Sequence, residues 1–459
     1  MRSGAKKIQH KLAGKLACRN AKSSLFCELL DVTYAEAIQF LYALRLFGAK
    51  FGLENTFRLA ELAGNPQKQL RFIHAAGTNG KGSTCAMLES IYRAAGLRVG
   101  LFTSPHLVSF RERIQINRQF ISEADVVRLV DDLKPLLGSF HDEHHPTFFE
   151  AVTVMALRYF AVQNCDLVIW ETGLGGRLDA TNIVTPLASV ITNIGIEHSQ
   201  WLGDTIEKIA AEKAGIIKPG VPVVTAATQG HGLEVIETIA REKHSPCTII
   251  NAAQVSQLLP ALELPLHGPH QRLNAALAVA TVRALANQIP VADAALSTGL
   301  ANVRWPGRMQ RVQTASGQTV LLDGAHNPDG AEALRIALQE EFPNSKPTMI
   351  FGVFRDKDSS SMCHSLAPLA GKILLTPVHS DRSEDPSKLV AVCRESNPHT
   401  PIEVCTSLTE ALQKSATARF VVIAGSLYLI GEAMELLHLI DASATDEKEL
   451  NEWMPSHKR

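Results

Sequence analysis

The segment that most restricts how this chain can fold is a glycine-rich turn between a short apolar run and a helical pattern. Residues 70–77, LRFIHAAG, have the composition of a buried strand, and residues 83–96, STCAMLESIYRAAG, have the spacing of a helix. A strand, a glycine turn and a helix in this order predict the start of an α/β fold.

The same alternation continues along the chain. Apolar residues at helical spacing, with Ala37, Leu41 and Leu44 on one face, predict a helical lead-in over 32–62. The later segments expected to be strands or helices are RVGLFTS, 123–137, 148–163, CDLVIWE, LASVITNIG, 204–213, VPVVTA and 267–285. Short β-branched runs separated by helices predict a mostly parallel sheet with helices on both faces.

A chain of 459 residues exceeds what one hydrophobic core usually organises, so two domains are expected. Proline and glycine in NVRWPGR, at 302–308, interrupt the periodicity and mark a candidate linker. Beyond it, helical patterns follow each of the runs TVLLDG, TMIFGV, KILLTPV, IEVCTS and FVVIAGS. The predicted organisation is a basic extension at 1–31, a larger α/β domain at 32–302, a smaller doubly wound domain at 303–444, and a polar tail at 445–459 that we expect to fray.

Charge and composition restrict the class of partner. The formal net charge of −1 argues against binding to nucleic-acid phosphates, so we expect small-molecule partners. No apolar run is long enough to cross a membrane, and eight cysteines without a CxxC pair predict reduced, buried thiols in a cytoplasmic protein. The first 27 residues contain Lys and Arg without Asp or Glu, which is typical of an organelle transit peptide; a disordered or partly helical basic extension is the simpler interpretation.

The turn itself carries the strongest chemical signal. In GTNGKGST, residues 77–84, backbone N–H groups at the start of a helix predict an anion site, to which Lys81 would add a positive charge for the β and γ phosphates of a nucleotide. Only Thr78 and Asn79 separate the first glycine from Gly-Lys, whereas the ordinary P-loop has four residues there. A glycine turn that arose by chance is the alternative.

Charged residues also follow the strands. Glu171 ends the run CDLVIWE at the edge where open α/β sheets bind ligands, so it is a candidate magnesium ligand; a helix cap or surface residue is the alternative. His198 ends ITNIGIEH in the same way, or is a structural hydrogen-bond partner. Asp323 closes a strand of the second domain, and Arg308 in the linker could reach a phosphate or form a surface ion pair. Lys213, taken alone, is typical of a solvated lysine at a helix end.

Several longer motifs occur in order over roughly residues 32–432: GTNGKGS, TSPHL, RERIQIN, ETGLGGRLDATN, EKAGIIK, HQRLNAALA, WPGRM, LDGAHNPDG and AGSLYLIGE. Together they resemble the folylpolyglutamate synthase and dihydrofolate synthase family, a branch of the Mur ligases. The resemblance implies an N-terminal P-loop NTPase-like Mur ligase domain and a smaller C-terminal Rossmann-like domain. The two domains would close over ATP, a folate and L-glutamate, with glutamate joined to the folate through an acyl phosphate.

The resemblance also implies roles for individual residues. The nucleotide would contact Asn79, Gly80, Lys81, Gly82, Ser83, Asn274, Arg308 and Asp323. Two Mg²⁺ sites would involve Ser104 and Glu171 in the first and His198 in the second, with Lys213 carbamylated to an anionic metal ligand. The pterin-bearing substrate would contact Gly52, Leu53, Glu54, Asn55, Thr147, Phe148, Leu178, Asp179 and Ala180, and glutamate would lie near His326 and Ser426. Lys81, Lys213, His198 and Glu171 would be the catalytic set.

Three positions depart from the family pattern. Asn55 stands where Arg is often found, Arg118 follows Asn117 where Gly is common, and Glu197 precedes His198 where Asp is usual. These departures concern the recognition of substrate and leave the residues of the ligase chemistry in place.

Other functions are compatible with parts of the pattern. Another Mur-type ligase acting on a different carboxylate would use the same phosphate machinery, and a non-catalytic ATP-driven switch would need no second-metal site. Within the family, the chain could be a dihydrofolate synthase, a folylpolyglutamate synthase or both. The bifunctional version is favoured because short bacterial-type members commonly do both, and a monomer is expected.

Overall fold

The structure is a computed structural model that describes residues 32–48, 52–141, 144–227, 230–259, 264–440 and 447–451. The chain divides into two compact units, Met1–Thr33 and Tyr34–Arg459, and the description below concerns the second. The basic extension at 1–31, and with it the possibility of organelle import, lies outside the described residues.

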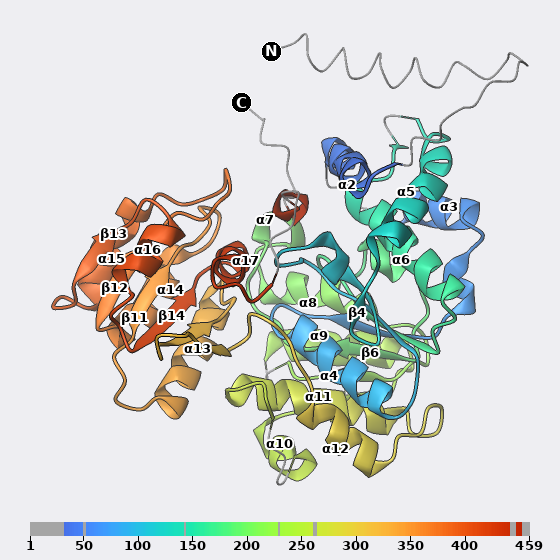
Figure 1. Ribbon diagram of the computed structural model, residues 1–459. Helices are drawn as coiled ribbons and strands as arrows, with labels where there is room; N and C mark the ends of the chain where they lie inside the picture. The colour runs from blue at the N-terminus through green and yellow to red at the C-terminus, as the bar shows by residue number, and fades with distance from the viewer. Residues whose placement is uncertain are drawn as a thin grey trace, which may run out of the picture. The chain divides into compact units, whose positions relative to one another are not determined.

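The first sheet has eight strands in the order β4-β3-β2-β5-β1-β6-β7-β8. Figure 1 labels β4 and β6 of this sheet and the helices around it. The strands are β1 (Phe72–Ala76), β2 (Val99–Phe102), β3 (Ile114–Ile116), β4 (Gln119–Phe120), β5 (Leu167–Glu171), β6 (Ala188–Ile191), β7 (Val223–Thr225) and β8 (Cys247–Ile249). The six strands from β2 to β8 pair in parallel, and the β3–β4 hairpin adds an antiparallel edge. Ala75 pairs with Glu171 on one side of β1 and with Val190 on the other, so three strands end at one edge.

Helices cover both faces of this sheet. They are α2 (Tyr34–Ala43), α3 (Glu54–Leu62), α4 (Lys81–Ala94), α5 (Glu123–Leu137), α6 (Phe148–Val162), α7 (Ser199–Leu202), α8 (Ile206–Ala214), α9 (His231–Glu242), α10 (Ala252–Leu258), α11 (Pro269–Ala284) and α12 (Asp293–Ala301). In β1, Phe72 faces the apolar cluster shared with α5 and α6, whereas Ile73 faces the cluster shared with α4 and α11. Because alternate residues of a strand point to opposite faces, a strand buried on both faces requires the continuous apolar runs seen in the sequence.

The second sheet has six strands in the order β13-β12-β11-β14-β10-β9, all parallel except β9. Its strands are β9 (Gln310–Gln313), β10 (Thr319–Leu322), β11 (Thr348–Phe351), β12 (Lys372–Leu375), β13 (Ile402–Val404) and β14 (Phe420–Ala424). Its helices are α13 (Pro328–Glu341), α14 (Ser359–Leu366), α15 (Pro386–Ser396), α16 (Leu408–Lys414) and α17 (Leu427–Leu436). One apolar cluster packs under α13 to α15 and another under α16 and α17.

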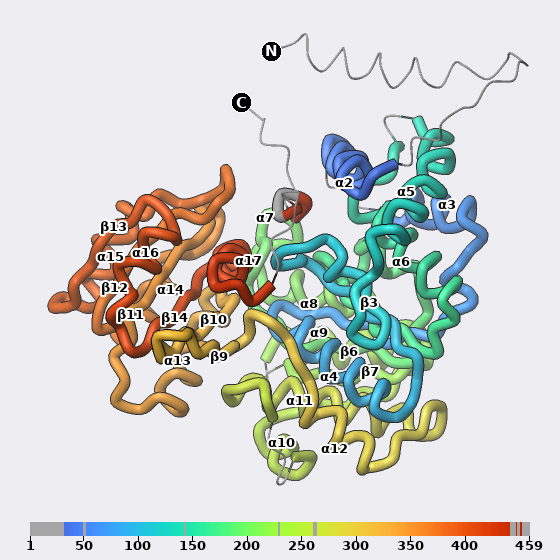
Figure 2. Tube along the Cα trace, in the orientation of Figure 1, coloured from blue at the N-terminus to red at the C-terminus, as the bar shows by residue number. Residues whose placement is uncertain are grey.

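The predicted α/β class and the strands expected from apolar runs are confirmed. Sequence analysis missed the β3–β4 hairpin, β8 and β9, because strands of two to four residues with polar members are too short to show a period. The Cα trace passes from α12 to β9 through residues 302–309, which form neither helix nor strand and contain the expected linker (Figure 2). The four domain boundaries stay a prediction.

The expectation of a frayed C-terminal tail is wrong for residues 447–451, the part of the tail that the structure describes. Residues Lys448–Asn451 form the 3₁₀ helix η7, and Leu450 is buried in the apolar cluster that includes α2. The contacts that hold this segment are mainly hydrogen bonds, which a hydropathy pattern does not reveal.

Six cysteines lie within the described residues, and all are free thiols. Five are buried as predicted, but Cys247 is exposed because it lies on β8, the edge strand of the first sheet. Cys18 and Cys27 lie outside the described residues. Among the described helices, none combines the length and the apolar character that crossing a membrane requires.

The packing of α12 on α4 generates a stability prediction. A Cβ added at Gly299 would lie 2.4 Å from Cα of Ile91, so Gly299→Ala forces the two helices apart. We expect the free energy of unfolding to fall by about 1–3 kcal/mol, as for other overpacked interiors, measured by urea unfolding followed by circular dichroism. Gly138→Ala is the matched control, because its Cβ would meet Lys134 O at an ordinary 3.5 Å. Equal denaturation midpoints for the two variants would contradict this packing.

Candidate functional site

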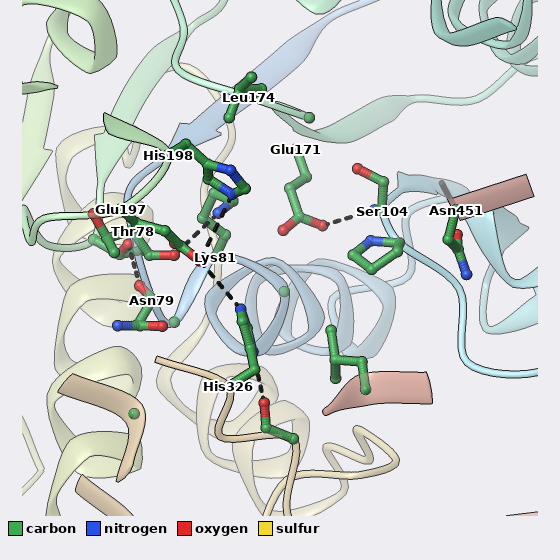
Figure 3. Close-up of a pocket in the computed structure, with 18 of the residues that line it drawn as sticks. Thr78, Asn79, Lys81, Ser104, Glu171, Leu174, Glu197, His198, His326 and Asn451 are labelled. Atoms are coloured by element: carbon green, nitrogen blue, oxygen red, sulfur yellow. Dashed lines mark hydrogen bonds and ion pairs between the residues drawn. The ribbon is translucent and has the colours of Figure 1, made fainter. Parts of the chain in front are cut away.

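The carboxyl ends of strands from both sheets open onto one cleft of about 380 Å³. The first sheet contributes the glycine turn, Glu171 and His198, and the second contributes Asp323 and His326. Figure 3 shows Lys81, Glu171, His198 and His326 around this cleft. A cleft of this size at the carboxyl edge of parallel strands is where open α/β sheets bind small ligands.

The glycine turn between β1 and α4 is possible only because its glycines lack side chains. Gly77 and Gly80 have φ of 147° and 83°, in the region that other residues rarely adopt. A Cβ at Gly77 would lie 1.9 Å from Oγ1 of Thr192, and one at Gly80 would lie 2.5 Å from Oδ1 of Asn274. Lys81 Nζ lies over the turn and donates to the carbonyls of Gly77 and Thr78 at 2.9 and 3.2 Å.

Asn79 connects the turn to the second sheet. Its side-chain amide pairs with that of Asn327, each Nδ2 donating to the other's Oδ1 at 3.2 and 3.0 Å. Its backbone N–H donates to Oδ1 of Asn193 at 2.7 Å. Asn327 also caps α13 by accepting from the N–H of Gly330. Sequence analysis missed Asn327 and Asn193, although the first lies within the motif LDGAHNPDG.

Glu171 is the last residue of β5, as predicted, and its carboxyl group is buried. Burial raises the pKa of Glu171 to about 7, although the charge of Lys81 and the N–H of Ser104 lower it. That N–H donates to Oε2 at 3.2 Å. The proton of Glu171 is therefore exchanged near neutral pH, and a cation in the cleft would favour the ionised form.

Lys213, on α8, is buried and does not line the cleft, so the solvated lysine expected from sequence alone is wrong. Its Nζ donates to the carbonyl of Gly77 at 2.9 Å, behind the glycine turn. Burial lowers the pKa of Lys213 to about 7, with a further contribution from the charge of Lys81, while Glu197 and Asp179 oppose the shift. A large fraction of this amine is neutral at physiological pH.

His198 does not end a strand, because β6 stops at Ile191 and His198 precedes α7 in the left-handed region at φ 53°. Its Nε2 lies 3.6 Å from Oε1 of Glu197. Burial lowers the pKa of His198 to about 4; the charge of Glu197 opposes this shift and that of Lys357 adds to it. The imidazole is therefore neutral at physiological pH, which is the form that binds metal ions.

Glu197 connects the two sheets, and sequence analysis singled it out only as a departure from the family pattern. Its Oε1 lies 3.0 Å from Nζ of Lys357 and 3.4 Å from Nε2 of His326, both from the second sheet's side. Burial raises the pKa of Glu197, but the hydrogen bond from His326 and the charges of His326 and Lys357 outweigh it and hold the pKa well below its usual range. Lys357 was also missed, since it follows no strand end or glycine motif.

The second sheet's side of the cleft contains Asp323, directly after β10. Its carboxylate accepts from the backbone N–H groups of Met309 and Ala325 at 2.8 and 2.9 Å. Arg308 is half-buried against Gly324 and lines the cleft; desolvation lowers its pKa, and the charges of Asp323 and Glu171 oppose that shift. Its Nη1 donates to the carbonyl of Gly307, and no surface ion pair of Arg308 occurs in the part of the chain that the structure describes. Asn274, on α11, donates to Oε1 of Gln271 at 3.2 Å while its Oδ1 faces Gly80.

The residues predicted to contact the pterin-bearing substrate are brought together in part. Six of them line the cleft: Gly52, Thr147, Phe148, Leu178, Asp179 and Ala180. His326 and Ser426, which were predicted to lie near glutamate, also line it. Leu53, Glu54 and Asn55, at the start of α3, do not line it. Asp179 accepts from the N–H groups of Gly173, Leu174 and Thr181 and so fixes the loop after β5.

The side chains near Glu171 determine whether the predicted Mg²⁺ could bind there. The described residues contain no group of three or more His, Cys, Asp or Glu side chains arranged to hold a metal ion. A buried carboxylate next to the Ser104 loop at the cleft wall nevertheless offers the hard oxygen donors that Mg²⁺ prefers, with substrate phosphates and water as further ligands. The residues present fit Mg²⁺ on the chemistry of the donor set.

Comparison with known protein families gives matches to Mur ligase domains in the segments that form both sheets. The Mur ligase middle domain matches residues 75–282, and the Mur ligase, glutamate ligase domain matches residues 307–427. The dihydrofolate synthase/folylpolyglutamate synthase of Bacillus subtilis is 37% identical over 431 residues, covering 88% of this chain and 99% of the relative.

Solved structures agree. Folylpolyglutamate synthase from Thermotoga maritima has a TM-score of 0.78 at 35% identity and covers 91% of this chain and 99% of that one. E. coli FolC, solved in complex with DHPP and ADP, has a TM-score of 0.77 at 29% identity over 89% of this chain and 98% of that one. Since identity above 30% extends over almost the full length of the Bacillus relative, the chain belongs to the folylpolyglutamate synthase and dihydrofolate synthase family of Mur ligases.

Proposed function

We propose that this chain is an ATP-dependent ligase that joins L-glutamate both to dihydropteroate and to the γ-carboxylate of folates. The observation that carries the proposal is that the glycine turn with Lys81, the buried Glu171 and the polar residues of the second sheet share one cleft. That arrangement would bind phosphate at one part of the cleft and leave space beside it for the acceptor carboxylate and the amine of glutamate. The FolC neighbour, solved with DHPP and ADP, supports a nucleotide and a pterin compound as ligands.

The nucleotide would occupy the turn. Backbone N–H groups of residues 80–83 at the start of α4 would bind its phosphates, and Lys81 would move from the loop carbonyls to the β and γ phosphates. Asn274, Arg308 and Asp323 would complete the site from α11, the linker and β10. The guanidinium of Arg308 lines the cleft, and its planar set of N–H donors suits a phosphate partner.

Ser104 and Glu171 would hold Mg²⁺ at the first site, with His198 and a carbamylated Lys213 at the second. When bound, Mg²⁺ would neutralise charge on the phosphoryl oxygens. For this role Glu171 must be ionised, and Lys81 and the N–H of Ser104 favour that form. His198 is already neutral, as ligation requires.

The chemistry follows from what an amide bond needs. An oxygen of the acceptor carboxylate attacks the γ-phosphorus of ATP, the bond to ADP breaks, and an acyl phosphate forms. The amine of glutamate then attacks the acyl carbon, and phosphate leaves from the tetrahedral intermediate after the amine loses a proton. The protein supplies orientation and charge stabilisation, with no side-chain nucleophile. His326 and Ser426 would orient glutamate, and the contacts of Glu197 with Lys357 and His326 would keep this side of the cleft aligned with the glycine turn.

The direct test measures ADP release by purified protein with ATP, Mg²⁺ and L-glutamate, with dihydropteroate or tetrahydrofolate as acceptor and product masses recorded. We expect glutamate to be added to both acceptors. Addition to one acceptor alone would reduce the proposal to that activity. Addition to neither would reject it in favour of a different carboxylate acceptor. A cytoplasmic monomer remains our expectation for the working form.

The role of Lys81 gives a second prediction. In Lys81→Met the cation is lost while the length of the side chain is kept, so kcat/KM for ATP should fall by roughly 10²–10³, as when a charge-stabilising donor is removed elsewhere. Coupled ADP release measures the loss. Lys68→Met, an exposed lysine in the short 3₁₀ helix Pro66–Gln69 that precedes β1, is the matched control and should leave the rate unchanged. A loss of less than tenfold in Lys81→Met would argue against phosphate contact.

Carbamylation of Lys213 gives a third prediction. Its neutral amine would add to carbon dioxide, forming an N–C bond and releasing one proton, which converts a buried neutral amine into an anionic carbamate. Because the pKa of Lys213 is lowered to about 7, the neutral form, and with it the carbamate, should increase as the pH rises from about 6 to about 8 at fixed dissolved carbon dioxide.

The measurement is the carbamate resonance in ¹³C NMR of protein equilibrated with ¹³C-labelled carbon dioxide. The resonance should be absent in Lys213→Met and unchanged in Lys208→Met, an exposed lysine of the same helix that pairs with Asp204. Identical spectra for the unmodified protein and Lys213→Met would exclude carbamylation at this position.

A further inference from the structure

The C-terminal segment 447–451 contacts the loop that carries Ser104. Six residues, 441–446, separate it from Ile440, which follows the last helix of the second sheet, yet its partners belong to residues 104–113 next to the first sheet. The segment also packs against α2, and Tyr34 of that helix donates to Glu447 Oε2 at 3.1 Å. It therefore joins the end of the chain to one wall of the cleft.

Asn451 pairs with both backbone groups of His106. The His106 N–H donates to Oδ1 at 3.3 Å, and Nδ2 donates to the His106 carbonyl at 2.9 Å. Oδ1 also accepts from Nη2 of Arg113 at 2.5 Å. An asparagine amide that satisfies an N–H, a carbonyl and a buried guanidinium at once fixes the backbone two residues after Ser104.

Glu447 fixes the next part of the same loop. Its carboxylate accepts from the backbone N–H of Phe110 at 2.5 Å and from the hydroxyl of Ser109 at 3.1 Å. Its carbonyl lies 2.8 Å from Nε2 of His106. Since Nδ1 of His106 accepts from Nε of Arg113 at 2.9 Å, Nε2 carries the hydrogen and donates to Glu447.

These contacts extend to side chains that line the cleft where the acceptor is proposed to bind. Arg113, oriented by Asn451 and His106, lies over the ring of Phe148 at 5.4 Å from the ring centroid and lines the cleft. Leu450 is 1% exposed, shares an apolar cluster with Phe148, and lines the cleft together with Asn451. In Figure 3, Ser104 lies between Glu171 and Asn451.

We propose that residues 447–451 are a positioning segment for the acceptor side of the cleft: Asn451 and Glu447 hold residues 106–113 so that Arg113 stays over the ring of Phe148. The segment thereby sets the affinity for the pteroate or folate acceptor, and Leu450 forms part of the wall that this acceptor contacts. This inference rests on the proposed ligase function. A tail that only needed anchoring would not require paired hydrogen bonds to a loop of the cleft.

Two truncations provide the test and its control. A chain ending at Asn451 keeps the segment, whereas a chain ending at Ile440 removes it. We expect KM for tetrahydrofolate to rise roughly tenfold or more in the shorter chain, since several hydrogen bonds are lost, while KM for ATP stays within about twofold. The chain ending at Asn451 should match the full-length protein. Asn451→Ala should reproduce the acceptor effect in part, and a synthetic peptide of residues 441–459 should restore it to the shorter chain.

The rate of amide hydrogen exchange measures the contact between the segment and the loop independently of enzymatic activity. The amides of His106 and Phe110 donate to the segment, so a peptic fragment covering 104–113 should exchange faster in the shorter chain and at the normal rate in the chain ending at Asn451. If the full-length protein ligates glutamate to neither acceptor, the proposed function fails, while this exchange result still decides whether the loop depends on the segment.

Three outcomes would overturn the proposal. Equal acceptor KM in both truncations would show that the segment has no effect on substrate. A parallel loss of ATP and acceptor affinity with a lowered melting temperature would show a purely structural role. A lower acceptor KM in the shorter chain would show that the segment obstructs the cleft.

Discussion

The parallel pairing of β1 between β5 and β6 is the constraint on which the site depends. Because Ala75 is in register with Glu171 and Val190, the glycine turn after β1, the carboxylate at the end of β5 and the loop after β6 meet at one edge. Close approach at that edge is what requires glycine at 77, where any side chain would collide with Thr192. The proposed phosphate site is thus a consequence of strand register more than of the turn sequence alone.

Burial at this edge acts on acids and bases in opposite directions. It raises the pKa of Glu171 and lowers that of Lys213, so both groups titrate near neutral pH. Desolvation disfavours the charged form of each, while the charge of Lys81 favours the ionised carboxylate of Glu171 and disfavours the protonated amine of Lys213. A triphosphate with its cation supplies charge of both signs in one ligand, so its binding would stabilise the ionised carboxylate and Lys81 together. The cleft is therefore electrostatically arranged for a ligand of mixed charge.

Sequence patterns could predict the groups whose position follows from a strand end or a glycine. Glu171 and Asp323 lie where the apolar runs stop, and the turn of Lys81 follows from β1 and α4. The patterns could not place Lys213 behind Gly77 or join Asn79 to Asn327, because these pairs are far apart in sequence and depend on how helices pack on the sheets. His198 was assigned the right edge but the wrong local structure.

The C-terminal segment shows the limit of hydropathy most sharply. Within 447–451 the apolar contribution comes from Leu450 alone, so no periodic signal distinguishes the segment from a solvated tail. Its docking depends on the pairing of Asn451 and Glu447 with backbone groups of the loop after Ser104. Every residue except proline carries a backbone N–H and a carbonyl, so the sequence does not show which of these groups will hydrogen-bond to a distant side chain. A wall of the cleft built in this way can be recognised only once the chain is folded.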